Sequence, residues 1–421
     1  MRQTEVTAVT ALANGLLRSN LRTGRDERTS AEYRYLCPSP GTYPWQWLWD
    51  SCFHAVAMAH VDPEHAVAEL VTLASTQRED GFIPHVTYWG VRLWGMGQPF
   101  AYLQAPPGQT LRYSGLMHPP VFAQAVERVA EVTRDTTVIT ALLGALDAHH
   151  NWLATNRAPD EDGLLVIVSP YESGMDQSPA YDAVLGLSGR PGRWALGVRQ
   201  RWLDVRNWLD SCDSAKMLRR GTFRVKDPLV NACYADSLET MARLHRRTGN
   251  GAVSAAYAQL AAQVTGALVD KLYDRSRGAF FALWGADERR SEPRTVAGLA
   301  PLTISGLPAD VAAELVERSI TDRDGFWMAH PVPSVAADEP AFNPRSGSVL
   351  WRGPIWVNTN WMLWRGLRRH GFDDLATQLA ARTLSTVANA GLREFYNPLN
   401  GQGMGARSFG RSALALDMAA R

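Results

Sequence analysis

The stretch that decides the fold is residues 228–272, PLVNACYADSLETMARLHRRTGNGAVSAAYAQLAAQVTGALVDKL. Pro228 stands where the first turn of a helix tolerates a residue without an N–H group. Segments 228–247 and 252–272 have the composition of helices, and Gly-Asn-Gly at 249–251 provides a tight turn between them. The sequence therefore predicts two antiparallel helices joined by a short loop.

Helical periodicity extends to both sides of this hairpin. Segment 137–152 places Ile139, Leu142, Leu143 and Leu146 at i, i+3, i+4 and i+7. Further helices are predicted at 65–77, at 355–370 with Pro354 before and Gly371 after it, and from Asp373 or Asp374 to about residue 389.

A turn signal recurs at the ends of the predicted helices, where a polar turn and a glycine lead into apolar residues. The instances are EDGFIPHV at 79, EDGLLVIV at 161, SRGAFFAL at 276, RDGFWMAH at 323 and NAGLREFY at 389. Their uneven spacing excludes a solenoid of fixed period. Helical hairpins whose loops gather at one end fit better, and we expect an all-α (α/α)6 barrel, two concentric rings of helices forming a single domain over residues 1–421.

Several connections are too long to be simple linkers. They are rich in aromatic residues, glycine and proline, and they cover residues 36–50, 86–121, 168–225 and 327–354. Loops of this length in a compact domain usually form the functional site.

Composition narrows the function. The chain has 421 residues, 46% of them hydrophobic, and a formal net charge of +1, which gives no reason to expect nucleic acid or an anionic membrane as partner. Neither a signal peptide nor eighteen consecutive apolar residues is present, so a cytoplasmic protein is expected, with a homo-oligomer left open. The four cysteines contain no CxxC pair, and no calcium loop or nucleotide fingerprint occurs, so no metal or cofactor is expected. Fifteen tryptophans suit the apolar faces of sugar rings.

Three carboxylates stand among aromatic residues and glycines. Asp176 lies in YESGMDQSP, Glu394 in GLREFYNPLNGQGMG and Asp50 in GTYPWQWLWDSCF. Individually, Asp176 could cap a turn, Glu394 could be a surface acid, and Asp50 could be the N-cap of a helix that begins at Ser51. Two carboxyls across an aromatic cleft are what hydrolysis of a glycosidic bond needs, and apolar neighbours would raise the pKa of Asp176 as a general acid requires.

Four motifs in their expected order resemble family 63 of the glycoside hydrolases and the related trehalases, with the small bacterial members the most similar. They are YPWQWLWDSCFHA, ESGMDQSP, WRGPIWVNTNWMLWRGL and REFYNPLNGQGMGARSFGRSALALD, and they span about residues 40–418. The resemblance implies an (α/α)6 barrel and hydrolysis of an α-glycoside with inversion, with Asp176 as general acid and Glu394 as general base. The absence of an added β-sandwich favours the hydrolases of mannosylglycerate and glucosylglycerate over the large oligosaccharide glucosidases.

The sequence departs from the family pattern at two positions. Arg411, in Phe409-Gly410-Arg411-Ser412-Ala413, replaces an expected tryptophan, and His118 in SGLMHPPV replaces an expected glutamine. Arg411 either binds an anionic group of the substrate or points outward from the last helix. His118 either binds substrate or holds a loop in place. The residues expected to bind substrate are Tyr43, Trp47, Trp49, Asp50, His85, His118, Trp351, Arg352, Trp356, Gln402 and Arg411.

Two other classes of function are open. A neutral disaccharide of the trehalose or kojibiose type is an alternative substrate for the same chemistry. A sugar epimerase on the same barrel would use histidines for proton transfer, and His85 and His330 follow two of the recurring turns. A binding protein without activity is expected to have lost one carboxylate, and both are present.

Overall fold

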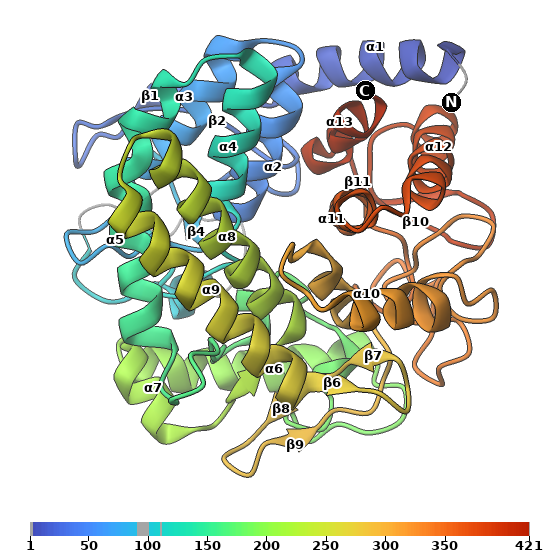
Figure 1. Ribbon diagram of the computed structural model, residues 1–421. Coiled ribbons are helices and arrows are strands. Elements are labelled where there is room, and N and C mark those ends of the chain that lie inside the picture. The colour runs from blue at the N-terminus through green and yellow to red at the C-terminus, as the bar shows by residue number, and fades with distance from the viewer. Residues whose placement is uncertain (1–2, 91–100, 110–111, 421) are drawn as a thin grey trace.

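The computed structural model describes residues 3–90, 101–109 and 112–420, and the chain in it is mostly helical (Figure 1). Residues 91–100, which belong to the predicted loop 86–121, lie outside the described residues.

Six inner elements form a closed ring. Each contacts the next in the order given, and the last contacts the first. They are α2 (Leu48–Ala59), α4 (Phe122–Thr133), α8 (Pro228–Arg247), η5 (Val296–Thr303), α11 (Val357–Arg369), and η7 (Gly410–Leu414) continued by α13 (Ala415–Ala419). All twelve residues of α2 are buried, as a helix surrounded by other helices requires.

An outer element packs on each member of this ring. The outer elements are α1 (Gln3–Asn20), α3 (Pro63–Ala74), α5 (Thr137–Arg157), α9 (Gly251–Leu272), α10 (Ala309–Leu315) and α12 (Asp373–Ala390). α1 packs on α12 and α13, so the first helix covers the last inner element and both termini lie at one corner (Figure 1). This arrangement confirms the predicted pair of concentric rings.

The hairpin of α8 and α9 follows the prediction closely. Asp227 caps α8 by accepting hydrogen bonds from the N–H groups of Leu229 and Val230, and Pro228 occupies the first helical position. α9 is long and apolar enough to cross a membrane by length and composition, but only 28% of its apolar window is buried and it packs along α8. Most of its alanines are exposed, as in a helix of the outer ring.

One prediction about local structure was wrong. The segment 168–225, expected as a loop, contains α6 (Arg193–Leu209) and α7 (Ser214–Arg220). Apolar residues on the exposed face of α6, such as Trp194 and Trp202, hide its helical period. The fourth inner element, η5, is a 3₁₀ segment because Pro301 interrupts it and Gly298 approaches a backbone carbonyl, where a Cβ would lie 2.2 Å from the oxygen of Phe280.

Short antiparallel strands build the loops. The pairs are β1 (Leu21–Arg25) with β2 (Glu32–Leu36), β3 (Gln46–Trp47) with β4 (Val86–Thr87), β6 (Tyr273–Asp274) with β7 (Ala279–Phe280), and β10 (Arg393–Tyr396) with β11 (Gly403–Arg407). A three-stranded sheet joins β5 (Val225–Lys226), β8 (Leu283–Trp284) and β9 (Arg289–Arg290). Two short 3₁₀ turns, η3 (Pro170–Ser173) and η4 (Pro179–Tyr181), flank residues 174–178.

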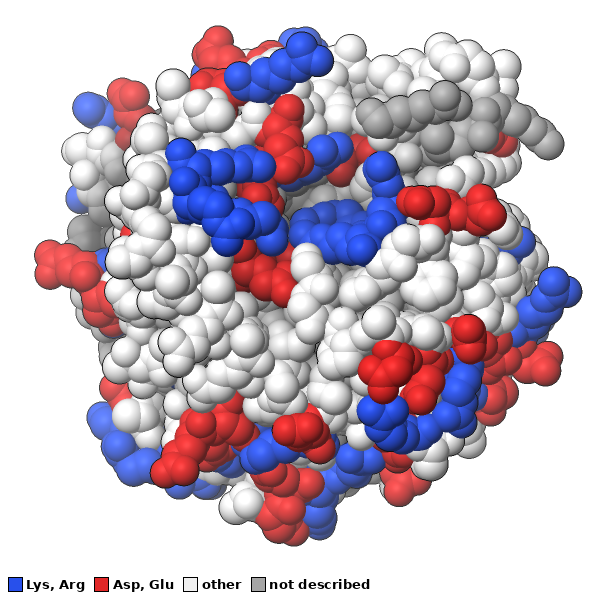
Figure 2. All heavy atoms as spheres, in the orientation of Figure 1, with Lys and Arg blue, Asp and Glu red and all other residues white. Residues whose placement is uncertain are grey.

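The two ends of the barrel differ. Loops and strands cover the end where α2 and α11 begin. At the other end, where α4, α8 and α11 finish, the surface is hollowed and carries basic side chains beside acidic ones (Figure 2).

Candidate active site

A cavity lies at the end of the barrel where α2 and α11 begin, and it offers about 70 Å³ to the centres of water-sized molecules. Such a volume holds about five waters, which a hexose ring could displace. Eleven of the thirteen residues predicted for the site line this cavity. They are Tyr43, Trp47, Trp49, Asp50, His85, His118, Asp176, Trp351, Trp356, Glu394 and Arg411.

Both carboxyl oxygens of Glu394 accept a hydrogen bond. Glu394 lies on β10, where Tyr43 Oη donates to Oε1 at 2.9 Å and Ala406 N donates to Oε2 at 2.8 Å. Gly405 next to it has φ +66°, and a Cβ there would lie 2.5 Å from Oε2, so only glycine fits. Burial, followed by the Glu394 charge, raises the pKa of Tyr43, which therefore stays a donor. This carboxylate is positioned to accept a proton.

Asp176 lies in the loop between η3 and η4. The pKa of its carboxyl is raised to about 7, chiefly by burial and to a smaller extent by the charges of Glu394 and Asp50, while its own backbone N–H and Arg411 oppose the rise. Gly174, with φ +68°, lets this loop approach the indole of Trp49, since a Cβ would lie 2.3 Å from the ring. The backbone carbonyl of Asp176 accepts a hydrogen bond from Gln200 Nε2 at 2.5 Å. The backbone of Asp176 is thus held in place, and the raised pKa leaves a substantial fraction of its carboxyl protonated near neutral pH.

Asp50 and Arg411 form an ion pair inside the cavity, with 3.0 Å between Oδ1 and Nε. Asp50 is not an N-cap as considered from the sequence, because α2 begins at Leu48 and Asp50 lies in its first turn. Arg411 points inward, and its guanidinium lies 5.0 Å from the ring of Trp49 and 5.4 Å from that of Trp356. Burial raises the pKa of Asp50 to about 6 although Arg411 lowers it. Arg411, which stands where the family pattern has a tryptophan, is thus held by aromatic rings and a carboxylate.

Trp351 and Trp356 form a flat aromatic wall. Their rings are 3.9 Å apart and nearly parallel, at 6°. Trp351 has φ +60°, a conformation that is strained for a residue with a side chain. Strain of this kind persists where the surroundings fix it, often at functional sites. A wall of this shape suits the apolar face of a sugar.

The two cavity histidines are neutral. Burial lowers the pKa of His85 to about 3 and that of His118 well below its ordinary value. His118 Nδ1 accepts a hydrogen bond from the backbone N–H of Trp49 at 3.3 Å, which satisfies one of the free N–H groups at the start of α2. His330, which the epimerase hypothesis pairs with His85, instead contacts Thr386 Oγ1 at 2.9 Å and does not line the cavity.

Arg352 and Gln402 are absent from the described lining of the cavity. Arg352 is buried behind it, where Nη1 donates to Asp182 Oδ2 at 2.9 Å and Nη2 to Oδ1 at 2.5 Å. Asp182 therefore draws this guanidinium away from the sugar-binding side. Gln402 is exposed in the turn between β10 and β11. Contact of Arg352 or Gln402 with substrate therefore stays a prediction that the described lining of the cavity does not support.

A second cavity adjoins the first and offers about 120 Å³. The two share Tyr43, Trp47, His85 and Asp176. The residues found only in the second are Trp45, Val86, Tyr88, Gln104, Tyr171 and Arg201. Arg201 on α6 was missed from the sequence, because its helix was hidden in the predicted loop 168–225. Its guanidinium also pairs with Asp204, at 3.1 Å. Arg201 could have been found from the sequence as a basic residue within a long segment that was already expected to form the site.

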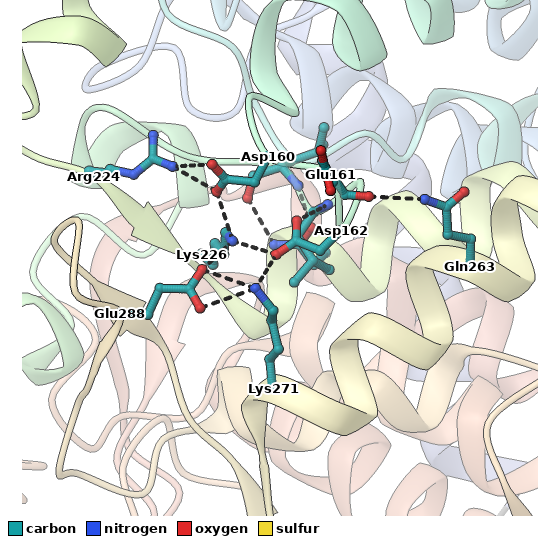
Figure 3. A network of polar contacts seen from close by, with 11 residues as sticks. Asp160, Glu161, Asp162, Arg224, Lys226, Gln263, Lys271 and Glu288 are labelled. Atoms are coloured by element: carbon teal, nitrogen blue, oxygen red, sulfur yellow. Dashed lines mark hydrogen bonds and ion pairs between the residues drawn. The ribbon is translucent and has the colours of Figure 1, made fainter.

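One cluster of acids has the spacing of a metal centre but already holds cations. Oxygens of Asp160, Asp162 and Glu288 lie within 4.8 Å of one another. Lys226 Nζ contacts all three carboxylates, and Lys271 Nζ lies 2.7 Å from Asp162 and 3.1 Å from Glu288 (Figure 3). Two ammonium groups therefore neutralise the oxygens that a metal ion would use. The cluster ties the loop after α5 to β5 and α9, and it lies outside the described lining of both cavities.

Comparison with known proteins places the chain in a family. The family model described as mannosylglycerate hydrolase MGH1-like glycoside hydrolase domain matches residues 43–412. A mannosylglycerate hydrolase of Thermus thermophilus is 32% identical over 413 residues, which cover 90% of this chain and 95% of the relative. A glucosylglycerate hydrolase of Mycolicibacterium hassiacum is 27% identical over 421 residues, which cover 90% and 92%.

Solved structures agree with this placement. The crystal structure of the family 63 mannosylglycerate hydrolase from Thermus thermophilus in complex with Tris and D-glycerate has a TM-score of 0.84 and 29% identity, and the match covers 98% of this chain and 100% of that one. Neutral trehalase Nth1 from Saccharomyces cerevisiae has a TM-score of 0.60 at 15% identity over 96% of this chain and 79% of that one, which shows a shared fold alone.

Proposed function

Since the chain belongs to the mannosylglycerate hydrolase MGH1-like glycoside hydrolases, we propose that it hydrolyses an α-glycoside of glycerate, the mannoside or the glucoside, with inversion at the anomeric carbon. Hydrolysis of a glycoside is the chemistry of the family, and the substrate and residue roles are our assignments. We also propose that the 421 residues act as one catalytic domain. The cytoplasmic location and the homo-oligomer considered from the sequence stay predictions.

One observation supports the mechanism above all others: Asp176, whose pKa burial raises to about 7, lines the same cavity as Glu394, whose two carboxyl oxygens accept hydrogen bonds from Tyr43 Oη and Ala406 N. Asp176 gives its proton to the glycosidic oxygen as the bond from that oxygen to the anomeric carbon breaks. Glu394 takes a proton from a water whose oxygen bonds to the anomeric carbon from the other side. Inverting enzymes place such carboxyls about 6.5–9.5 Å apart so that this water fits between them.

Because Asp176 lines both cavities, we assign one part of the substrate to each cavity. The acid must reach the glycosidic oxygen, so the scissile bond lies beside this residue, where the two cavities meet. The first cavity, with its tryptophan wall and Asp50, would take the sugar ring. The second would take the aglycone. This division explains why the acid is shared while Glu394 lines only the first cavity.

Arg201 is our candidate partner for the glycerate carboxylate. A carboxylate that enters a dry cavity costs several kcal/mol unless it is paired, and a guanidinium can bind it through two parallel hydrogen bonds. The sequence favoured Arg411 for this role, but Arg411 lines only the first cavity. Arg201 lines the second cavity, together with the polar side chains of Tyr88 and Gln104.

Replacing Arg201 by alanine is expected to raise KM for a glycosylglycerate by about 10- to 100-fold, the worth of a charge-assisted hydrogen bond. KM for a neutral α-disaccharide of the trehalose or kojibiose type should change much less. Steady-state kinetics on both substrates measures the difference. The exposed Arg199, two residues away on α6, supplies the control Arg199→Ala, which should behave as the wild type on both.

Equal losses on the charged and neutral substrates would remove Arg201 from aglycone recognition. A wild-type enzyme that prefers the neutral disaccharide would overturn the substrate assignment itself while leaving the glycosidase chemistry in place.

The pH dependence of kcat/KM should show the titration of Asp176. Because the acid works only when protonated and its pKa is raised to about 7, activity should fall as pH rises through about 7, with a limiting slope of one proton. Burial raises the pKa of Asp204 to about 7 as well, so the variant Asp204→Asn is the control and should keep this fall. Activity that keeps rising above pH 8 would contradict the assignment of Asp176 as the acid.

A further inference from the structure

A second hollow, remote from the active site, is lined by six arginines. We name it the arginine hollow, and it offers about 390 Å³ in the face shown in Figure 2, where basic side chains stand on both sides of a depression. Its lining consists of Gln124, Glu127, Arg128, Glu131, Arg243, Arg247, Ser305, Trp364, Arg365, Arg368, Arg369 and Asp417.

The arginine hollow is at the opposite end of the barrel from the active site. α11 connects the two, since its N-cap Trp356 lines the catalytic cavity and its last residue Arg369 lines the hollow. A helix of thirteen residues is roughly 20 Å long, so a ligand in the hollow would not touch a bound glycoside. The arginines come from the far halves of α4, α8 and α11, and Asp417 comes from α13.

Carboxylates pair with some of these arginines. Glu127 accepts two hydrogen bonds from Arg243, at 2.9 and 2.8 Å, and Asp417 Oδ1 accepts two from Arg128, at 2.9 and 2.7 Å. Behind the lining, Asp236 Oδ1 lies 2.5 Å from Arg369. These pairs hold the inner helices together and neutralise half of the guanidinium groups.

The other guanidinium groups are poorly compensated. Arg368 stacks on Trp364 at 5.3 Å and has no carboxylate partner in the described parts of the chain. Arg247 reaches Glu127 and Glu131 only at 3.8 and 3.6 Å. Arg365 is 3.5 Å from Asp236. Four carboxylates form ion pairs with five of the six arginines in the described parts of the chain, namely Glu127, Glu131, Asp417 and Asp236, so the six arginines and these four carboxylates together carry an excess of two positive charges.

Mutual repulsion among these groups is visible at Arg365. Its pKa is lowered to about 10, first by burial and then by the charge of Arg369. Helix dipoles explain part of the cluster, because Arg247, Arg368 and Arg369 lie in last turns, where a positive charge is favourable. Arg128, Arg243 and Arg365 lie further in, so the dipoles do not account for them.

We propose that the arginine hollow binds a compact dianion with the chemistry of a phosphate group. Guanidinium forks match phosphate oxygens in pairs, and a dianion would neutralise the two charges in excess. Arg368 and Arg247 at the rim would contact the phosphate first, with Arg365 behind them. The hollow is large enough for either inorganic phosphate or a small phosphate ester, which share this chemistry.

Titration calorimetry tests the proposal with inorganic phosphate, with glycerol 3-phosphate and with glycerol, at an ionic strength held constant by sodium chloride. Saturable binding of phosphate and of the ester, but not of glycerol, is expected. A tighter ester identifies the ester as the source and equal affinities identify free phosphate. The double variant Arg247→Ala, Arg368→Ala should bind about tenfold more weakly or worse, as expected for lost charge-assisted contacts, and should keep wild-type glycosidase activity.

Two control variants locate the binding. Arg289 is exposed and stacks on Trp284 as Arg368 does on Trp364, but it lies on β9, so Arg289→Ala should bind phosphate like the wild type. The variant Arg201→Ala should also bind phosphate like the wild type, because Arg201 lines the second cavity of the active site and not the arginine hollow. The proposal fails if the wild type shows no saturable binding up to about 10 mM phosphate. It also fails if the double variant binds normally, if Arg289→Ala loses as much affinity, or if Arg201→Ala abolishes binding.

Discussion

Replacing Asp176 by asparagine is expected to lower kcat on a natural glycoside by about two to four orders of magnitude, the usual contribution of a general acid. The amide keeps the shape of the side chain but has no acidic proton for the glycosidic oxygen. Because the cavity walls are unchanged, substrate affinity measured by calorimetry should stay near the wild-type value. Single-turnover kinetics measures the rate of the chemical step and calorimetry measures substrate affinity, so together they separate a slower chemical step from weaker binding.

A substrate with a better leaving group distinguishes the loss of the acid in Asp176→Asn from a general loss of structure. An aryl α-glycoside whose phenolate leaves without protonation should restore most of the activity of Asp176→Asn. Glu69 provides a matched control, since it is a buried carboxyl with a pKa raised to about 8 and lies outside the described lining of the cavities. Glu69→Gln should change kcat little. Near-normal turnover of Asp176→Asn on a poor leaving group would place the acid elsewhere.

Glu394→Gln should be as damaging, with a loss of about two to four orders of magnitude in kcat, because an amide cannot take the proton of the attacking water. In contrast with Asp176→Asn, a good leaving group should not restore activity, since attack by water is still unassisted. The same aryl glycoside therefore gives opposite results in the two variants.

Tyr43 and Ala406 already hold both oxygens of Glu394, so the amide disturbs at least one of these hydrogen bonds. Thermal unfolding of the variant controls for this effect. Recovery of Glu394→Gln on the aryl glycoside would indicate that Glu394 is not the base and that its role is to hold the loop.

The barrel could be predicted because local signals mark its helices. α8 and α12 were predicted within one residue of their observed ends, since prolines, aspartates and glycines bound them. α6 was missed because Trp194 and Trp202 face solvent and hide the helical period. A helix cannot be predicted from its amphipathic pattern alone where it exposes apolar side chains to solvent.

Residues of the cavity could be predicted only where a sequence motif determines the local backbone conformation. Glycine-bounded loops fixed the neighbourhoods of Asp176 and Glu394, and eleven predicted residues line one cavity. The orientation of the Arg352 side chain could not be predicted from the sequence, because it is set by Asp182, which lies 170 residues away in the chain. Arg201 reaches the second cavity from α6, which carries none of the four motifs, so tertiary packing alone places it there.

The central claim is that Asp176 and Glu394 together hydrolyse an α-glycoside of glycerate with inversion. Proton NMR of the wild-type enzyme acting on α-mannosylglycerate and α-glucosylglycerate, recorded within the first turnovers, tests this claim most directly. The account predicts that free sugar from one or both substrates appears first as the β anomer, with the α anomer growing later by mutarotation. Release of the α anomer first would contradict it, and so would the absence of free sugar from both substrates.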